Sequence, residues 1–162
     1  MVLFTLCGCT STTKTEGTRI SNKIQIKDVT LSFDQDSEFH DFKYKNINGI
    51  EPDESKQAVY LDYINKDLYD GRFVFRISMA FSDETNLNEF FENRTTEDVK
   101  INGINWKKSK INNKTDNKDT TSIVYATEKN GTLYAVTTVI FNESGVDINT
   151  ISKIFINGVT LK

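Results

Sequence analysis

The stretch Ile123-Val-Tyr-Ala-Thr-Glu-Lys-Asn-Gly-Thr-Leu-Tyr-Ala-Val-Thr-Thr-Val-Ile-Phe141 determines the fold. Two runs rich in β-branched and aromatic residues flank Asn130-Gly131, the dipeptide that most strongly favours a two-residue hairpin turn. Both faces of the second run are apolar, so we expect a central strand that is covered on both sides. Strands joined by such short turns must pair antiparallel, and this hairpin therefore predicts a mainly antiparallel sheet.

Other strands are expected on the same reasoning, because apolar residues alternate with polar ones at period two. The strictest alternation runs from Phe73 to Phe81, after a turn expected at Asp70-Gly71. A tight turn is expected at Asn102-Gly103, and a bend or bulge at Lys27-Asp28, where the alternation changes phase. The remaining expected strands are 24–26, 29–33, 59–63, 99–101, 104–106 and 159–161.

Two segments change to helical spacing. Residues 82–93 place Leu87, Phe90 and Phe91 on one stripe, with Thr85 or Asn86 as the N-cap. Residues 146–155 carry a second stripe, which we expect Asn157-Gly158 to end through a left-handed cap. Residues 107–121 are polar and are expected to form a long loop. The predicted fold class is α+β, a mostly antiparallel sheet with two helices packed on it.

Composition excludes several classes of function. The chain has 162 residues and a formal net charge of −3, and its acidic and basic side chains are interleaved, which argues against nucleic-acid binding. Its two cysteines, Cys7 and Cys9, precede the body of the chain, so a disulfide framework is not expected there. His40 is the single histidine, and we expect neither a metal site nor a cofactor.

The first nine residues, Met1-Val-Leu-Phe-Thr-Leu-Cys-Gly-Cys9, end in a motif that resembles the bacterial lipobox. That motif has an aliphatic residue, a small residue, Gly or Ala, and then an invariant Cys. The resemblance implies cleavage after Gly8 and a diacylglyceryl thioether, with acyl chains such as palmitate, on Cys9. Two or more acyl chains anchor stably where one is marginal. We therefore expect Cys9 to tie the protein to the outer face of the cytoplasmic membrane of a Gram-positive-like bacterium.

A complete secretory signal has a basic start and a longer apolar core, and neither is present here. We therefore expect that Met1 is an internal start or that the sequence is truncated. Two alternatives remain, a cytosolic protein with an apolar tip and a Cys-x-Cys metal site. On the lipoprotein interpretation, residues 1–8 are the remnant of a signal peptide, 9–22 are the lipidated cysteine and a flexible tether, and 23–162 are a single α+β domain.

Four segments of the domain are similar to the small PsbP/Mog1-like domains found in many bacterial lipoproteins. These segments are Val29–Phe33, Phe73–Phe81 with the helix after it, Val99–Trp106, and the Asn130-Gly-Thr-Leu-Tyr134 hairpin with the helix near the C-terminus. The resemblance covers roughly residues 24–162. It implies an α/β/α sandwich built on an antiparallel sheet, and it carries no catalytic residues to this chain.

Two acidic clusters are candidates for chemistry. Asp34, Asp36 and Glu38 alternate like calcium ligands, but Phe39 and Lys45 occupy the places where a calcium loop needs Gly and an acid. Glu51, Asp53 and Glu54 flank Pro52 and offer paired carboxylates for a hydrolase. We expect solvated acidic loops at both.

Aromatic residues give a third candidate. Tyr60, Tyr69 and Trp106 form a possible ligand surface, which could stack on sugar rings or on a partner protein, although core positions are favoured for most of them. The predicted function is a lipid-anchored extracytoplasmic binding or accessory domain without catalytic activity, with a protein or cell-wall partner. The alternatives are a cell-wall-directed hydrolase that uses carboxylates of the 34–54 region and a cytosolic interaction module.

Overall fold

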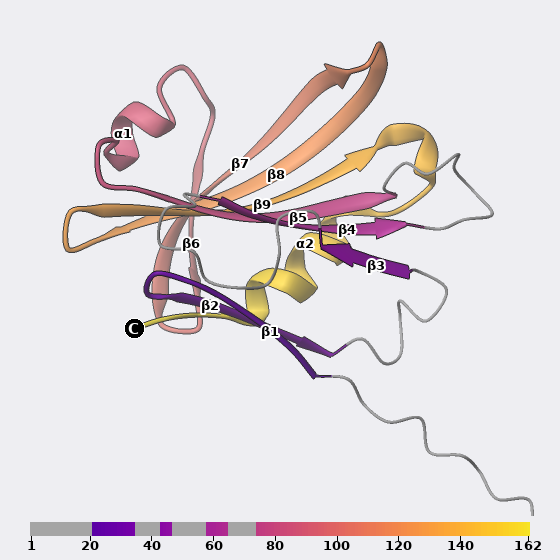
Figure 1. Cartoon of the computed structure of the whole chain (residues 1–162). Helices are drawn as coiled ribbons and strands as arrows, with labels where there is room; N and C mark the ends of the chain where they lie inside the picture. The colour runs from indigo at the N-terminus through magenta and orange to yellow at the C-terminus, as the bar shows by residue number, and fades with distance from the viewer. Residues whose placement is uncertain (1–20, 35–42, 47–57, 65–73) are drawn as a thin grey trace, which may run out of the picture.

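The computed structural model of the chain describes residues 21–34, 43–46, 58–64 and 74–162 (Figure 1). They form an α+β fold in which every described strand pair is antiparallel, as predicted. A seven-stranded sheet has the order β3-β4-β5-β9-β8-β7-β6, and a three-stranded sheet has the order β1-β2-β10. The strands are β1 (Ser21–Ile26), β2 (Val29–Asp34), β3 (Lys43–Asn46), β4 (Ala58–Ile64), β5 (Phe75–Ser82), β6 (Glu97–Ile101), β7 (Ile104–Thr115), β8 (Lys118–Lys129), β9 (Thr132–Phe141) and β10 (Val159–Leu161).

The hairpin predicted around Asn130-Gly131 is confirmed as β8 and β9. Asn130 and Gly131 have φ angles of 54° and 77°, the left-handed pair that a two-residue turn of this hand requires. The predicted turn at Asn102-Gly103, between β6 and β7, has φ angles of 53° and 78°. β9 is the middle strand of the seven, and most of its residues are buried, as its apolar faces predict.

Two expected irregular segments are regular in the structure. Residues 27–28 form no bulge, because β1 and β2 pair in unbroken register on both sides of a two-residue turn with Lys27 at φ 49°. Residues 107–121 form no long loop: all but Asp116 and Asn117, which make a two-residue turn, belong to β7 and β8, and these strands pair as far as Thr115 and Lys118. Most residues in the half of β7 that ends at Thr115 are exposed, on both faces of the strand. Its sequence therefore lacks the alternation by which a half-buried strand is recognised.

Both predicted helices are present. The first, α1 (Leu87–Phe90), is a single turn, shorter than the 82–93 segment suggested, and its N-cap is Asn86. The second, α2 (Ile148–Asn157), follows a short 3-10 turn, η1 (Asn142–Ser144), and is capped by Asp147. The left-handed cap expected at Gly158 is wrong, because its φ angle is −84°. Glycine is required there by close approach, since a Cβ atom would lie 2.0 Å from the Ser32 carbonyl oxygen.

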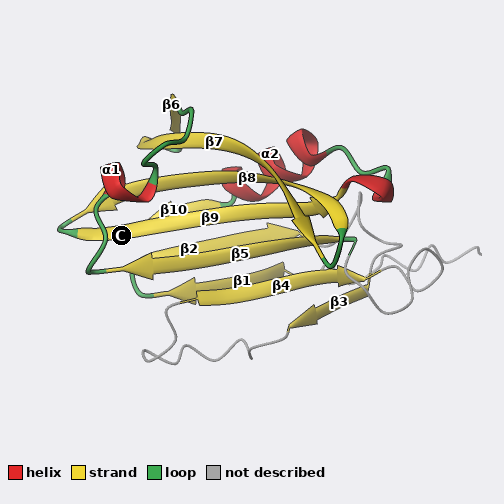
Figure 2. Ribbon diagram, turned by 90° about the horizontal axis from the view of Figure 1, so that it is seen from above, coloured by secondary structure: helices red, strands yellow, loops and turns green. Residues whose placement is uncertain are grey.

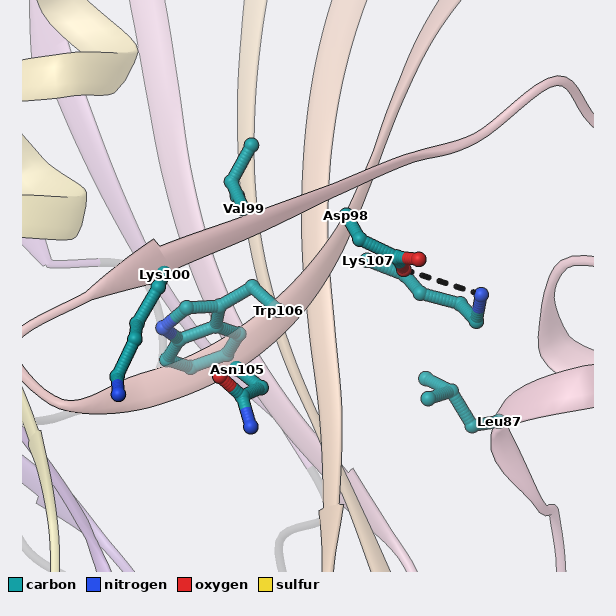
Figure 3. Close-up of a pocket in the computed structure, with 7 residues that line it drawn as sticks. All are labelled: Leu87, Asp98, Val99, Lys100, Asn105, Trp106 and Lys107. Atoms are coloured by element: carbon teal, nitrogen blue, oxygen red, sulfur yellow. Dashed lines mark hydrogen bonds and ion pairs between the residues drawn. The ribbon is translucent and has the colours of Figure 1, made fainter.

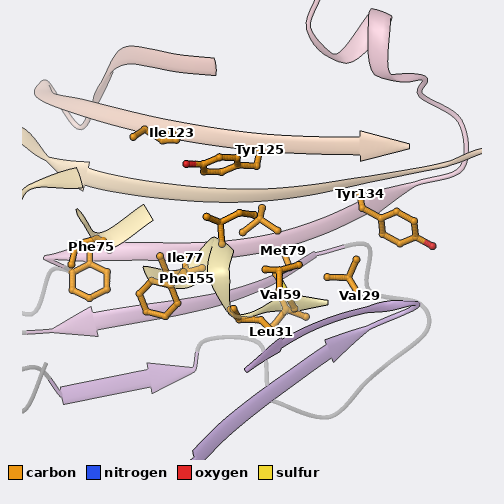
Figure 4. Close-up of a cluster of buried hydrophobic side chains, with 14 of the residues drawn as sticks. Val29, Leu31, Val59, Phe75, Ile77, Met79, Ile123, Tyr125, Tyr134 and Phe155 are labelled. Atoms are coloured by element: carbon orange, nitrogen blue, oxygen red, sulfur yellow. The ribbon is translucent and has the colours of Figure 1, made fainter. Parts of the chain in front are cut away.

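The main core lies between the two sheets, with α2 against both of them (Figures 1 and 4). The face of the seven-stranded sheet that contacts α2 is called the inner face, and the face covered in part by α1 is called the outer face. Phe155 of α2 packs against Phe75 of β5, with ring centroids 6.1 Å apart. Other fully buried core residues are Leu31, Ile77, Met79, Trp106, Ile123, Tyr134 and Ile156.

The outer face has its own smaller cluster, in which Phe91, next to α1, packs with Val124, Ala126, Leu133 and Ala135. Farther along this face, Arg76 of β5 holds Asp62 of β4 through two hydrogen bonds of 2.6 and 2.9 Å. Asp62 is 3% exposed, so the guanidinium supplies the partner that a buried carboxylate requires. Figure 2 shows the strands running side by side, with β6 at one edge of the large sheet.

Candidate binding groove

A groove of about 410 Å³ lies beside the β6–β7 hairpin, on the outer face of the sheet (Figure 3). We call it the outer groove. Its walls come from the hairpin and from α1. The residues that line it are Leu87, Asp98, Val99, Lys100, Asn105, Trp106 and Lys107.

The hairpin register brings the polar side chains of the outer groove together. The Asn102-Gly103 turn pairs Asp98 with Lys107 and Lys100 with Asn105 across the two strands. The Lys107 ammonium lies 3.1 Å from the Asp98 carboxylate and forms an ion pair with it (Figure 3). Lys100 and Asn105 are exposed, so an ammonium and an amide face solvent beside that ion pair.

The α1 wall of the groove is held by its cap. The Asn86 side chain accepts hydrogen bonds of 3.0 Å from the backbone N–H groups of Asn88 and Glu89. The backbone N–H of Leu87 donates to the carboxylate of Glu128 on β8 at 3.2 Å, which ties the first turn to the sheet. Capping thus places the apolar Leu87 side chain opposite the charged hairpin.

Trp106 is 1% exposed and lies in the core, although it also lines the groove. Its indole N–H is buried and has no hydrogen-bond partner in the part of the chain that the structure describes. Tyr60 lies on β4, and three strands separate β4 from the β7 strand of Trp106. Tyr60 and Trp106 therefore lie on strands that are not neighbours in the sheet, and Tyr69 lies outside the described residues.

A second hollow, of about 300 Å³, lies on the inner side of the same hairpin, between Glu97, Lys108 and Asn149 at the start of α2. The Glu97 carboxylate, which accepts a 2.5 Å hydrogen bond from Lys108, raises the pKa of the Lys108 ammonium. Successive β6 residues thus face opposite hollows, as the pleat of a strand requires.

The other predicted site residues are not assembled by the described chain. Asp34 ends β2, and Asp36, Glu51, Asp53 and the lipidation site Cys9 lie outside the described residues. No group of three or more His, Cys, Asp or Glu side chains that could hold a metal occurs within the described ranges. No described helix is long and apolar enough to span a membrane.

Sequence reasoning passed over Leu87, Asp98, Lys100, Asn105 and Lys107 as groove residues. The pattern that could have found four of them is the predicted turn itself. Residues equally far from Asn102-Gly103 in the two directions must pair, so an acid and a lysine fall opposite each other on one face. Leu87 joins them only through tertiary packing.

These features define a class of protein, an antiparallel α+β domain with a polar groove at a sheet edge. No family model matches the chain, and no curated protein matches it. Among solved structures, a crystal structure of a protein from Bacteroides thetaiotaomicron is similar, with a TM-score of 0.56 and 10% sequence identity. The match covers 83% of this chain and 45% of that one, so the chain spans less than half the length of that neighbour. At this identity the similarity shows the fold alone.

Proposed function

We propose that the chain is a binding or accessory domain without catalytic activity, and that the outer groove is its ligand site. The observation that carries this proposal is that the exposed Lys100 and Asn105 side chains line the same groove as the apolar Leu87 side chain. A few placed polar groups beside an apolar surface are typical of ligand sites. Ammonium and amide donors suit a ligand that carries carboxylate and amide groups, such as the peptide stems of cell-wall fragments.

We further propose that a lipid on Cys9 holds this domain at the outer face of the cytoplasmic membrane. The lipobox resemblance at Leu6–Cys9 supports the anchor. The proposed relationship to PsbP/Mog1-like domains is supported by the placement of α1 and α2 on opposite faces of the large sheet (Figure 1). In an α/β/α sandwich, helices likewise lie on both faces of a central sheet.

The anchor is tested by metabolic labelling with an alkyne fatty acid. The wild-type protein and the Cys7→Ala variant should both be labelled, whereas the Cys9→Ala variant should not. Cys7 is the matched control because it is a neighbouring thiol that the proposed cleavage removes. Absence of label on the wild type, or equal label on Cys9→Ala, would reject the anchor.

The ligand site is tested by titrating the protein with soluble cell-wall fragments. Binding is measured by isothermal titration calorimetry, because Trp106, the one tryptophan of the chain, is buried in the core and does not face the ligand. Asn105→Asp places a negative charge in the groove with almost no change of shape and should weaken the binding of acidic fragments. Asn113→Asp makes the same change on an exposed residue of the same strand and should have no effect. Equal loss in both variants, or no binding by the wild type, would contradict the site.

A further inference from the structure

Among the described strands, β6 forms one edge of the large sheet. It is the last strand in the order, with β7 as its neighbour. The two-residue turn makes Ile101 and Ile104 a hydrogen-bonded pair, and hydrogen-bonded and non-hydrogen-bonded pairs alternate from there along the hairpin. The backbone N–H and C=O groups of Asp98 and Lys100 therefore point away from β7. No backbone hydrogen bond from the other described residues reaches these groups. An edge of this kind is a template for another strand.

The charges along β6 are antisymmetric. The strand reads Glu97-Asp98-Val99-Lys100-Ile101, with an acid before Val99 and a base after it. When two copies of β6 lie antiparallel with Val99 facing Val99, each Asp98 stands opposite the Lys100 of the other copy. Opposite charges directly across an antiparallel pair are favourable, and like charges are unfavourable.

We propose that two copies of this chain associate through β6, about a two-fold axis at Val99, to form one continuous sheet. The register is consistent with the backbone, because Asp98 and Lys100 are the residues whose N–H and C=O groups point outward. They would form the hydrogen-bonded pairs, and Val99 would form the close, non-hydrogen-bonded pair. The Asp98 side chain is 82% exposed, so it can meet a second lysine while it keeps its contact with Lys107.

The other edge of the large sheet does not suit self-association. β3 reads Lys43-Tyr44-Lys45-Asn46, and the same operation about Tyr44 sets lysine opposite lysine. Lysine-rich edges are a common protection against strand pairing. The complementary charge order at β6 is therefore the feature that selects a second copy as the partner of that edge.

The pairing would join the two outer grooves, since Asp98 and Lys100 line the groove and also meet across the axis. The interface does not depend on the lipid or on the ligand of the groove. Its failure is therefore distinguishable from failure of the proposed function, which is tested with Asn105 on the neighbouring strand.

Disulfide trapping tests the geometry in the full chain with Cys7 and Cys9 replaced by serine. In the proposed dimer the two Val99 Cα atoms are about 4.5 Å apart, close enough for a disulfide. Val99→Cys should therefore cross-link on mild oxidation. Ile101→Cys, two positions along the same face, should not, because the two residues 101 lie about 13 Å apart along the paired strands. Equal cross-linking of the two variants would overturn the register.

Charge reversal tests the partner, with sedimentation equilibrium as the measurement and circular dichroism as the check on folding. Residue 98 of each copy meets residue 100 of the other, so Asp98→Lys alone places lysine opposite lysine at two positions, and Lys100→Asp alone places aspartate opposite aspartate at two positions. Either variant should lower the association constant by about tenfold or more. An equimolar mixture of the two variants, and the double variant D98K/K100D, should regain association.

A wild-type chain that stays monomeric at every concentration would overturn the proposal. Folded charge variants whose mixture associates no better than either alone would do the same. Capture of an acidic peptide at β6 without self-association would replace the second copy with another partner and also count against it.

Discussion

At Gly158 the connection between α2 and β10 passes so close to β2 that no side chain fits. The backbone N–H of Ser32 donates to the Gly158 carbonyl at 3.0 Å, which holds the two segments together. The glycine was expected from sequence to adopt a left-handed conformation, as glycines after helices often do. Its φ angle of −84° is open to any residue, so the constraint comes from β2, which lies far away in sequence.

Gly158→Ala should lower the free energy of unfolding by about 2–3 kcal/mol, because the added methyl group must push back a backbone carbonyl. Gly131→Ala is the matched control. Its Cβ would meet nothing within 4 Å, so it should lose only about 1 kcal/mol from the left-handed conformation. Urea unfolding of the two variants measures the difference. A smaller loss at Gly158 than at Gly131 would contradict the close approach.

Among the elements, α2 depends on a carboxylate at its start. Asp147 accepts hydrogen bonds from the Thr150 hydroxyl at 2.7 Å and from the backbone N–H of Asn149 at 3.0 Å. These bonds, the Thr150 bond above all, hold the pKa of Asp147 below its usual value. The Asp147 carboxylate therefore binds a proton less tightly in the folded protein than in the unfolded chain.

Consequently the contribution of Asp147 is present at neutral pH and is lost as the pH falls through about 4 and below. Asp147→Asn keeps an acceptor for the cap without the charge and should show a shallower loss of stability with acid than the wild type. Asp147→Ala removes the acceptor and should be less stable than Asp147→Asn at neutral pH. Urea unfolding from pH 3 to pH 7 checks both; parallel pH profiles for wild type and Asp147→Asn would disprove the role of the charge.

Most helices and strands were predictable from the sequence, because local backbone preferences and the pattern of buried residues indicate the same structure. Asn130-Gly131 sets its turn through backbone conformation alone, and Phe75, Ile77 and Met79 alternate because one face of β5 lies in the core. The β7–β8 hairpin was missed beyond Trp106, since residues 112–115 of β7 are exposed on both faces and the buried β8 positions beside them, Thr120 and Thr121, are polar. Neither strand therefore shows an apolar period there. The length of α1 also depends on tertiary contacts, which a helical stripe does not reveal.

The groove was predictable only in part. The Asn102-Gly103 turn and strands 99–101 and 104–106 were expected, but Lys107 was placed in a loop. Its ion pair with Asp98 requires both strands to continue one residue farther from the turn. Trp106 was one of three possible ligand residues, with core positions favoured for most of them, and it is buried in the main core cluster together with Ile156 and Val159, about 50 positions later in sequence. Contacts with elements far away in sequence decide which side of a hairpin is covered, and these contacts cannot be read from a single sequence.

In the whole molecule, the small sheet is fastened to the large one at the β1–β2 turn. The Tyr134 hydroxyl on β9 donates to the Asp28 carboxylate at 3.0 Å. Lys27 forms an ion pair with Asp83 at 2.5 Å and lies over the Phe81 ring. Burial, followed by the hydrogen bond to Asp28, raises the pKa of Tyr134 to about 12.

The folded phenol therefore holds its proton to a higher pH than the unfolded phenol, whose pKa is about 10. Its contribution to stability is complete below pH 10 and is lost as the pH rises toward about 12. Tyr134→Phe should be less stable at pH 7, because it leaves Asp28 without this donor, but less sensitive to alkali. Urea unfolding at pH 8 to pH 11 measures both; an equally steep alkaline loss in the variant would contradict the assignment.

The small sheet joins the first described strands to the last. β10 pairs with β2, and the backbone N–H of Lys162 donates to the Asp28 carbonyl. During synthesis the β1–β2 hairpin therefore lacks its third strand until residues 159–161 have left the ribosome, and a two-stranded hairpin alone is at best marginal in water. The small sheet thus cannot form until β10 has been made, after every described strand of the large sheet, so the first described hairpin is the last to gain its full set of partners.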